Sequence, residues 1–265
     1  MAIQQGYKYI LLEKPIDPSI AESVKLAEAA KQHQVNIQVC HSFVRGDWGD
    51  TTVSSPMIMA KCCHDMDLIV YLTGTNCKSI SSYGALTHFK PENAPEGSTE
   101  RCIDIFKLKD KCPYNAIKIY QERKEFRKLA CEKEGFTDLD EALRKGRFGR
   151  CVYRCGNNAV DHQTVNILLE DDITVALTMS AFSHRIGRDI RIMGTMGEIF
   201  GSVEDSIIHV HHFASGDMDT LKVAHFEAGH SGADEMIMRD FVRMVATGAR
   251  GITAYLSVSR DTGSA

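Results

Sequence analysis

The second half of the sequence is a succession of short strand-like runs, and this succession limits the possible fold more than any other feature. The runs are residues 162–170, 173–182, 189–194, 198–203, 207–213 and 221–226. Their connections are short and turn-like, for example Glu170-Asp171-Asp172 and Gly194-Thr195-Met196-Gly197. Strands joined by tight turns pair antiparallel, because a parallel pair needs a long crossover connection. The sequence therefore predicts a large, mostly antiparallel sheet.

The N-terminal forty residues follow a different pattern. Residues 7–12 and 35–40 are strand-like, and residues 20–33 between them have helical spacing, with Asp17 and Ser19 as candidate caps. A strand, helix and strand in this order predict two parallel strands with a right-handed crossover. Ligands bind beyond the carboxyl ends of such strands. Lys14 and His41 directly follow the two strands, and we expect both to face this crevice.

The predicted fold is therefore a small α/β segment followed by an α+β domain. Residues 1–41 form a partial Rossmann-type βαβ unit, and residues 42–265 form a domain with a large antiparallel sheet and flanking helices. The remaining predicted elements are a loop over 42–60, helices over 61–74, 113–130, 137–146 and 232–246, a strand over 78–89 and a loop over 90–99. In the third helix Thr137 is the expected cap, with Asp140 three residues later.

The helix predicted over residues 61–74 carries the best candidate for acid–base chemistry. His64 and Asp67 lie one turn apart on one face. Leu68, Ile69 and Leu72 form an apolar stripe that would hold the helix against a core, and Gly74 provides a left-handed stop. A histidine and a carboxylate on a rigid helix suit proton transfer, but on spacing alone a solvated polar face is the simpler interpretation.

Composition excludes several classes of function. A formal net charge of -4 and a pI near 6.3 argue against a nucleic-acid partner. No stretch approaches the roughly 20 apolar residues that span a bilayer, so no membrane partner is expected. The first fifteen residues lack the pattern of a signal peptide, which predicts a cytoplasmic protein.

The nine cysteines allow two interpretations. Cys102, Cys112, Cys151 and Cys155 could together supply thiolates to a tetrahedral zinc ion, although neither pair has CxxC spacing. Free cysteines buried in a reduced protein are the default interpretation, so no metal is assigned.

Three motifs in a fixed order resemble the Gfo/Idh/MocA family of glucose–fructose oxidoreductase and inositol dehydrogenase relatives. They are Glu13-Lys14-Pro15 at a strand end, the helix His64-x-x-Asp67-x-x-x-x-Leu72-x-Gly74, and the turn Gly194-Thr-Met-Gly197 between two strands. The resemblance extends from Glu13 to about Val245. It implies an NAD- or NADP-dependent dehydrogenase that removes hydride from a sugar, cyclitol or related polyol, and a homo-oligomer formed through the sheet.

The resemblance also implies roles for individual residues. His64 would be the acid/base, Lys14 would polarise the reacting oxygen, and Asp67 would orient His64 or bind substrate hydroxyl groups. Glu13, Lys14, Pro15 and His41 would lie at the cofactor. His230 is a further candidate for a substrate contact, because it occurs in a glycine-containing turn before the last predicted helix.

The sequence departs from the family pattern in two important ways. It contains no GxGxxG turn, which in the family holds the pyrophosphate at a helix N-terminus. It also has Ala60 where family members often have an aspartate four residues before the histidine. We therefore expect a member truncated at its N-terminus or internally deleted, and three functions stay open: a sugar dehydrogenase whose activity depends on cofactor binding, a redox glycosidase of the same fold, and a non-catalytic chain that oligomerises through its sheet.

Overall fold

The structure is a computed structural model that describes residues 9–13, 36–40, 49–104, 111–122, 124–132, 135–182, 187–202, 205–223 and 233–249. The chain forms two compact units, Met1–Phe182 with Thr253–Ala265, and Ser183–Ile252. The helix predicted over 20–33 lies outside the described residues, as do the predicted site residues Lys14, Pro15, His41 and His230. The domain boundary predicted after residue 41 stays a prediction.

The two N-terminal strands pair in parallel, as predicted. β1 (Tyr9–Glu13) pairs with β2 (Asn36–Cys40) in register, so that Glu13 lies opposite Cys40 at the carboxyl ends of both strands. This places the ends of the two strands at one edge, the edge at which parallel sheets bind ligands. Glu13, predicted to lie at the cofactor, is the last residue of β1.

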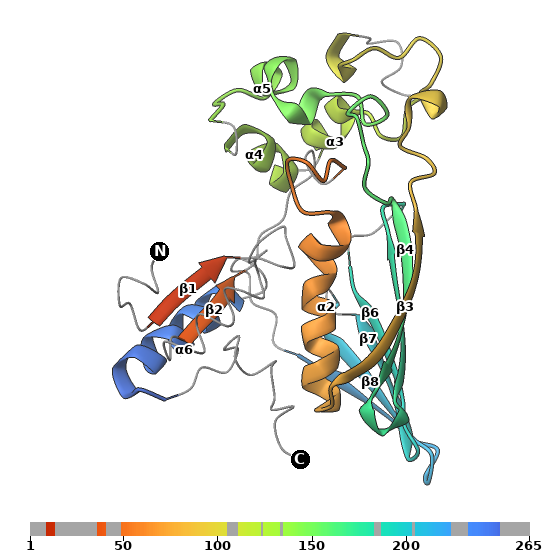
Figure 1. The fold of residues 1–265 in the computed structure, drawn as a ribbon, viewed down its shortest axis with the longest axis vertical. Helices are drawn as coiled ribbons and strands as arrows, with labels where there is room; N and C mark the ends of the chain where they lie inside the picture. Colours follow the sequence, from red (N-terminus) through yellow and green to blue (C-terminus); the bar gives the residue numbers. More distant parts are fainter. Residues whose placement is uncertain are drawn as a thin grey trace. The chain divides into compact units, whose positions relative to one another are not determined.

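A three-stranded antiparallel sheet follows, in the order β3-β4-β5. Its strands are β3 (Cys77–Ala85), β4 (His162–Leu169) and β5 (Thr174–Ser180), and the 3₁₀ turn η6 (Glu170–Asp172) joins the last two. Side chains alternate across β4, so Val165, Ile167 and Leu169 are buried on one face. Helix α2 (Met57–Thr73) covers this face (Figure 1) through Ile58, Met66 and Ile69.

The opposite face of this sheet carries mostly small or polar side chains. Ser81 pairs with Asn166, and Tyr83 pairs with Thr164, which places these four side chains on the face away from α2. Tyr83 is 78% exposed.

Helix α2 differs from its predicted form at its start and in its core contacts. It begins at Met57, after Pro56 as N-cap, so the loop predicted to continue to residue 60 ends earlier. Its stop is as predicted: Gly74 has a φ of 67°, and its N–H donates to the Val70 carbonyl. Of the predicted apolar stripe only Ile69 joins the sheet core, and Leu72 is 51% exposed.

A lobe of short helices lies between β3 and β4 in the chain. It contains η2 (Pro91–Asn93), η3 (Cys102–Asp104), α3 (Ala116–Glu122), α4 (Lys124–Glu132), α5 (Leu139–Lys145) and η5 (Arg147–Gly149). Ile117, Tyr120, Ala130, Leu143 and Phe148 form its buried core.

Two details of the predicted lobe were wrong. The single helix predicted over 113–130 is two helices, because α3 and α4 pack against each other and contribute to the same core. Asp138, rather than Thr137, caps α5 by accepting a hydrogen bond of 2.9 Å from the N–H of Glu141. The predicted end of this helix at Gly146 is confirmed.

The second compact unit contains a four-stranded antiparallel sheet in sequential order and a helix. The strands are β6 (Asp189–Met193), β7 (Gly197–Ser202), β8 (Ile207–His212) and β9 (Met218–Lys222), and the helix is α6 (Ala233–Thr247). The predicted antiparallel pairing is confirmed, but the described strands lie in two separate sheets rather than in one large sheet, and the last strand is at 218–222 rather than 221–226. The last strand starts early because a tight turn, with Gly216 at a φ of 74°, reverses the chain directly after β8.

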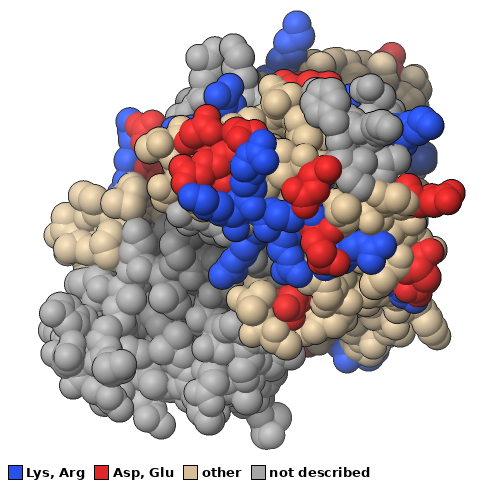
Figure 2. Space-filling model, turned by 90° about the horizontal axis from the view of Figure 1, so that it is seen from above, with Lys and Arg blue, Asp and Glu red and all other residues tan. Residues whose placement is uncertain are grey.

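Charged side chains of both signs share the face shown in Figure 2, where Lys and Arg gather with Asp and Glu beside them. On α5 the pairs are Arg144 with Asp140, at 2.7 Å, and Lys145 with Glu141, at 2.8 Å. None of the helices in the described ranges is long and apolar enough to cross a membrane.

The tightest backbone approach in the helical lobe gives a stability prediction. A Cβ atom on Gly149 would overlap the carbonyl oxygen of Leu143, a backbone atom that cannot move without disturbing α5. We expect Gly149→Ala to lower the free energy of unfolding by about 3 kcal/mol or more. Urea unfolding measures this. Gly194→Ala is the control, since its Cβ would meet only one atom, at 3.4 Å; equal effects of the two substitutions would contradict the packing described.

Candidate functional site

Helix α2 presents His64 and Asp67 on the side opposite to the sheet. At 100° per residue, His64 lies about 200° from the sheet-contacting Met66 and about 60° from Asp67. His64 is half-buried and Asp67 is exposed. The helix predicted to carry both residues is confirmed, and its contacts with the core of the β3-β4-β5 sheet come from Ile58, Met66 and Ile69.

Two residues just before His64 are more buried than a solvated helix face allows. Ala60 is 4% exposed and Lys61 is 9% exposed. Sequence reasoning did not single out Lys61, although a buried lysine is uncommon and often functional. Lys61 lies one turn before His64, so its ammonium group is a further candidate for acid–base chemistry on this helix.

The local environment makes Asp67 a weaker acid than a free aspartate. Neighbouring atoms remove water from its carboxyl group, and this desolvation raises the pKa of Asp67 above its ordinary value. A carboxyl group with a raised pKa retains its proton to higher pH.

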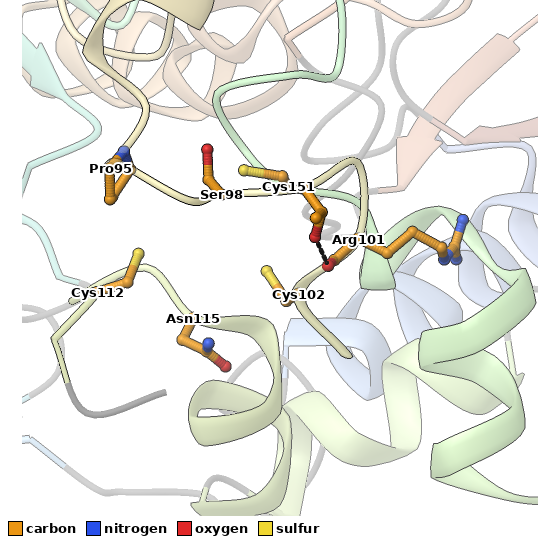
Figure 3. A pocket seen from close by; sticks show the side chains of 8 residues that line it. Pro95, Ser98, Arg101, Cys102, Cys112, Asn115 and Cys151 are labelled. Atoms are coloured by element: carbon orange, nitrogen blue, oxygen red, sulfur yellow. Dashed lines mark hydrogen bonds between the residues drawn. The ribbon is translucent and has the colours of Figure 1, made fainter. Parts of the chain in front are cut away.

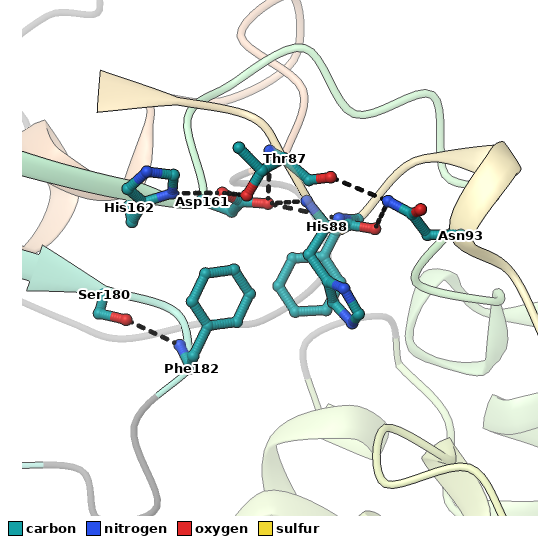
Figure 4. Close-up of polar contacts among 8 residues, drawn as sticks. Thr87, His88, Asn93, Asp161, His162, Ser180 and Phe182 are labelled. Atoms are coloured by element: carbon teal, nitrogen blue, oxygen red, sulfur yellow. Dashed lines mark hydrogen bonds and ion pairs between the residues drawn. The ribbon is translucent and has the colours of Figure 1, made fainter. Parts of the chain in front are cut away.

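A second polar cluster lies where β3 ends and β4 begins (Figure 4), centred on Asp161, which is 3% exposed. One carboxylate oxygen accepts the N–H groups of Thr87, His88 and Phe89 at 3.0, 2.7 and 3.3 Å. The other lies 2.9 Å from Nδ1 of His162. The strand predicted to continue to residue 89 therefore ends at Ala85, because these N–H groups bond to a carboxylate instead of a neighbouring strand.

The hydrogen bonds determine the protonation state of Asp161. Burial favours the neutral carboxyl, but the hydrogen bonds from the N–H of His88, from His162 and from the other two N–H groups outweigh it and lower the pKa of Asp161. Asp161 is therefore an ionised, fully bonded carboxylate that shapes the 87–89 segment.

Aromatic rings surround His88 in the same region. Its Nε2 lies 3.1 Å from the hydroxyl of Tyr153, and its ring packs edge-on against Tyr153 and Phe182 at 5.3 and 5.7 Å. Burial, with Cys112, Tyr114 and Cys151 nearby, raises the pKa of Tyr153 to about 12. The sequence offered no signal for this cluster, because Tyr153 and His88 are 65 residues apart.

Three of the four cysteines singled out as zinc candidates line one cavity (Figure 3). Cys102, Cys112 and Cys151 do so, together with Asn115. Cys155 is not among the lining residues, and its Sγ donates to the carbonyl of Cys151 at 3.1 Å. Within the described ranges, no three His, Cys, Asp or Glu side chains are already arranged to hold a metal ion.

Comparison with solved structures identifies the fold. The chain is similar to UDP-N-acetylglucosamine 3-dehydrogenase from Acidithiobacillus ferrooxidans, with 14% identity and a TM-score of 0.57, over 97% of this chain and 68% of that one. An oxidoreductase domain protein from Kribbella flavida is 12% identical with a TM-score of 0.62, over 97% and 70% of the two chains. The chain has the fold of the Gfo/Idh/MocA-type oxidoreductases.

The same fold also occurs in a regulatory protein. A super-repressor mutant of Gal80p from Saccharomyces cerevisiae is 10% identical with a TM-score of 0.56, over 93% of this chain and 61% of that one. The chain thus spans between about three fifths and seven tenths of these structures. No family model matches the sequence, and neither does any curated protein.

The Asp161 cluster gives a prediction of pH-dependent stability. Asp161→Asn replaces a carboxylate that accepts several N–H groups, so we expect the free energy of unfolding at neutral pH to fall by about 2–4 kcal/mol. The folded-state pKa lies below the unfolded one, so this contribution is complete above about pH 4 and is lost as the pH falls through the folded pKa.

Urea unfolding of both proteins between neutral and acidic pH measures the difference. The gap between wild type and variant should narrow only at acidic pH. Asp217→Asn, at an exposed turn, is the control and should change stability little. A gap that is constant with pH would show that the ionised carboxylate is not the stabilising group.

Proposed function

We propose that this chain carries the substrate side of a sugar or polyol oxidoreductase site, with His64 as the acid/base. The observation that carries the proposal is the arrangement of α2, which packs on a sheet of the matching fold through one face and presents His64 and Asp67 on the other. The neighbour from Acidithiobacillus ferrooxidans is a dehydrogenase of a sugar nucleotide, which supports a sugar-like alcohol as substrate.

The proposed chemistry uses the two α2 residues in distinct roles. An imidazole nitrogen of His64 takes the proton from a substrate hydroxyl group and returns it in the reverse direction. Asp67 accepts a hydrogen bond from an adjacent hydroxyl group or orients His64. Lys14, by the family resemblance, stabilises the developing negative charge on the substrate oxygen.

The cofactor fits this chain only in part. NAD(P), when bound, would supply the hydride acceptor, and the parallel β1–β2 pair provides the type of strand edge at which nicotinamide cofactors bind. The 265 residues contain no GxGxxG turn to hold a pyrophosphate. The proposed cofactor residues are those of the resemblance: Glu13, Lys14, Pro15 and His41.

Cofactor titration tests the proposal directly. We expect NADH or NADPH to bind to the chain saturably but weakly, with a dissociation constant of about 0.1–1 mM, because the pyrophosphate contacts are missing. Fluorescence of the reduced cofactor and calorimetry measure this binding. No saturable binding at millimolar concentrations of either cofactor would exclude both the dehydrogenase and the redox glycosidase for this chain.

If the cofactor binds, a matched pair of histidine variants tests the acid/base. His64→Asn should lower kcat/KM for the best substrate in a sugar and polyol panel by about 10²–10⁴-fold, with cofactor affinity unchanged. His211→Asn, at an exposed position on β8, is the control and should keep full activity. Net accumulation of NADH indicates the dehydrogenase, since a redox glycosidase returns the hydride in each turnover. Equal activity of the two variants would exclude His64.

One observation favours a non-catalytic alternative. The solved neighbour Gal80p, a super-repressor mutant, has this fold. A chain that bound sugar or cofactor without turnover would bind in the titration and fail in the activity assay.

Self-association through the β3-β4-β5 sheet is a separate part of the proposal. On the open face of this sheet the side chains around the exposed Tyr83 are small or polar. Because they protrude little, a second copy of the chain can approach closely there. We expect Tyr83→Arg to shift the chain to the monomer in light scattering. Tyr71→Arg, at an equally exposed tyrosine on α2, is the control. An unchanged mass for Tyr83→Arg would place any interface elsewhere.

A further inference from the structure

Three thiols from separate segments face one small cavity in the helical lobe. Cys102 is in η3, Cys112 precedes α3, and Cys151 follows η5. Figure 3 shows their sulfur atoms directed toward the same space, a cavity of about 30 Å³. One water needs about 10–15 Å³ in this measure, so the cavity has room for about two waters or for one molecule of hydrogen peroxide.

Two of these thiols also lie near the hydroxyl group of Tyr153. Burial is the main cause of the raised pKa of Tyr153, and Cys112, Tyr114 and Cys151 add to it through electrostatic interaction. Because such an interaction weakens with distance, it places both thiols in the neighbourhood of this hydroxyl group. Cys112 and Cys151 therefore share two neighbours, the cavity and the Tyr153 hydroxyl group.

The backbone holds the segments of these two thiols in place. The N–H of Cys151 donates to the Glu100 carbonyl at 2.8 Å, and the Cys151 carbonyl accepts the N–H of Arg154 at 2.9 Å. The carbonyl of Cys112 accepts the N–H of Asn115 at 3.2 Å, and the Asn115 side chain caps the start of α3. Both thiols thus belong to short segments that are fixed by hydrogen bonds.

The other groups near the cavity are directed elsewhere. Cys155 is not a lining residue, and its Sγ donates to the Cys151 carbonyl at 3.1 Å. The guanidinium group of Arg101 points away from the thiols (Figure 3) and donates to the carbonyl oxygens of Leu143 and Gly146. The three thiols are the only readily oxidised side chains among the residues that line the cavity.

We propose that Cys112 and Cys151 form a peroxide-reactive dithiol, which is oxidised to a disulfide and is reduced again by external thiols. Cys112 is half-buried and Cys151 is 7% exposed, so peroxide reaches Cys112 first and Cys151 is the resolving thiol. Redox-sensitive cysteines typically combine an accessible thiol with a resolving thiol beside it. In a reduced compartment, a disulfide of this kind is transient and regulatory.

The two chemical steps use one molecule of peroxide for each disulfide. The Cys112 sulfur attacks one peroxide oxygen, the O–O bond breaks, and the departing hydroxide takes up the proton of the thiol and leaves as water. The Cys151 sulfur then attacks the resulting sulfenic acid, so that the S–S bond forms, the S–O bond breaks and a second water leaves with the Cys151 proton. The two sulfur atoms are oxidised, and the two peroxide oxygens are reduced to water.

The disulfide would link two elements at the edge of the lobe core. Cys112 precedes α3, whose Ile117 and Tyr120 are buried in this core, and Cys151 follows η5, whose Phe148 is buried in it. Oxidation therefore ties the start of α3 to the loop after η5. The proposal is independent of the oxidoreductase function proposed above, and its test uses no activity measurement.

Peptide mapping of the full chain identifies the disulfide directly. The reduced chain is exposed to a small molar excess of hydrogen peroxide, denatured in the presence of N-ethylmaleimide and digested with trypsin without reduction. Arg101, Lys111 and Arg150 directly precede the three thiols, so each thiol lies in its own tryptic peptide. We expect the Cys112 and Cys151 peptides to be joined with the loss of two hydrogen atoms, and dithiothreitol to separate them. No joined peptide, or a link from either thiol to Cys102, would overturn the proposal.

Matched variants test the order of the two steps. Cys151→Ser should lose the link, and its Cys112 should accumulate as sulfinic acid, because no resolving thiol is present. Cys77→Ser removes an exposed thiol on β3 and should form the link as fully as the wild type. If Cys151→Ser fails to fold, the wild type is sufficient: after peroxide, alkylation of Cys112 and Cys151 should be lost together and return together with dithiothreitol. Loss of alkylation at Cys112 alone would overturn the proposal.

Discussion

The packing of α2 on the β3-β4-β5 sheet is the interaction on which the candidate site depends. Ile58, Met66 and Ile69 bury one side of the helix against Val165, Ile167 and Leu169. Fully burying one such side chain contributes roughly 1.5–3 kcal/mol, so several together determine the rotation of the helix about its axis. This rotation directs His64 and Asp67 away from the sheet. The orientation of His64 and Asp67 therefore follows from the packing of the opposite side of α2 against the sheet core.

The sequence predicted these elements well where local patterns determine them. The parallel β1–β2 pair, the meander from Asp189 to His212, the Gly74 stop and α6 all follow from short-range periodicity and turn chemistry. Predictions failed where a distant residue overrode the local pattern. The strand expected over 78–89 stops at Ala85 because Asp161, more than seventy residues later, takes the N–H groups of the next turn.

The candidate site could be predicted only in part, for the same physical reason. His64 and Asp67 belong to one helix, so their spacing was sufficient to pair them. The His88–Tyr153 contact and the three-thiol cavity join segments that only the tertiary fold brings together. The apolar stripe of α2 was misjudged for a related reason. Leu72 fits the helical period, but its position near the helix end leaves it 51% exposed.

The substrate half and the cofactor half of the proposed chemistry differ in what this chain supplies. In the proposed substrate half, the described residues supply a packed helix, an imidazole, and a carboxyl group whose desolvation raises its pKa. The cofactor half consists of a parallel strand pair without the glycine turn that supplies N–H groups to a pyrophosphate. The core that orients His64 is formed by α2 and the β3-β4-β5 sheet and does not include β1 or β2, so the proposed acid/base keeps its orientation whether or not a dinucleotide binds.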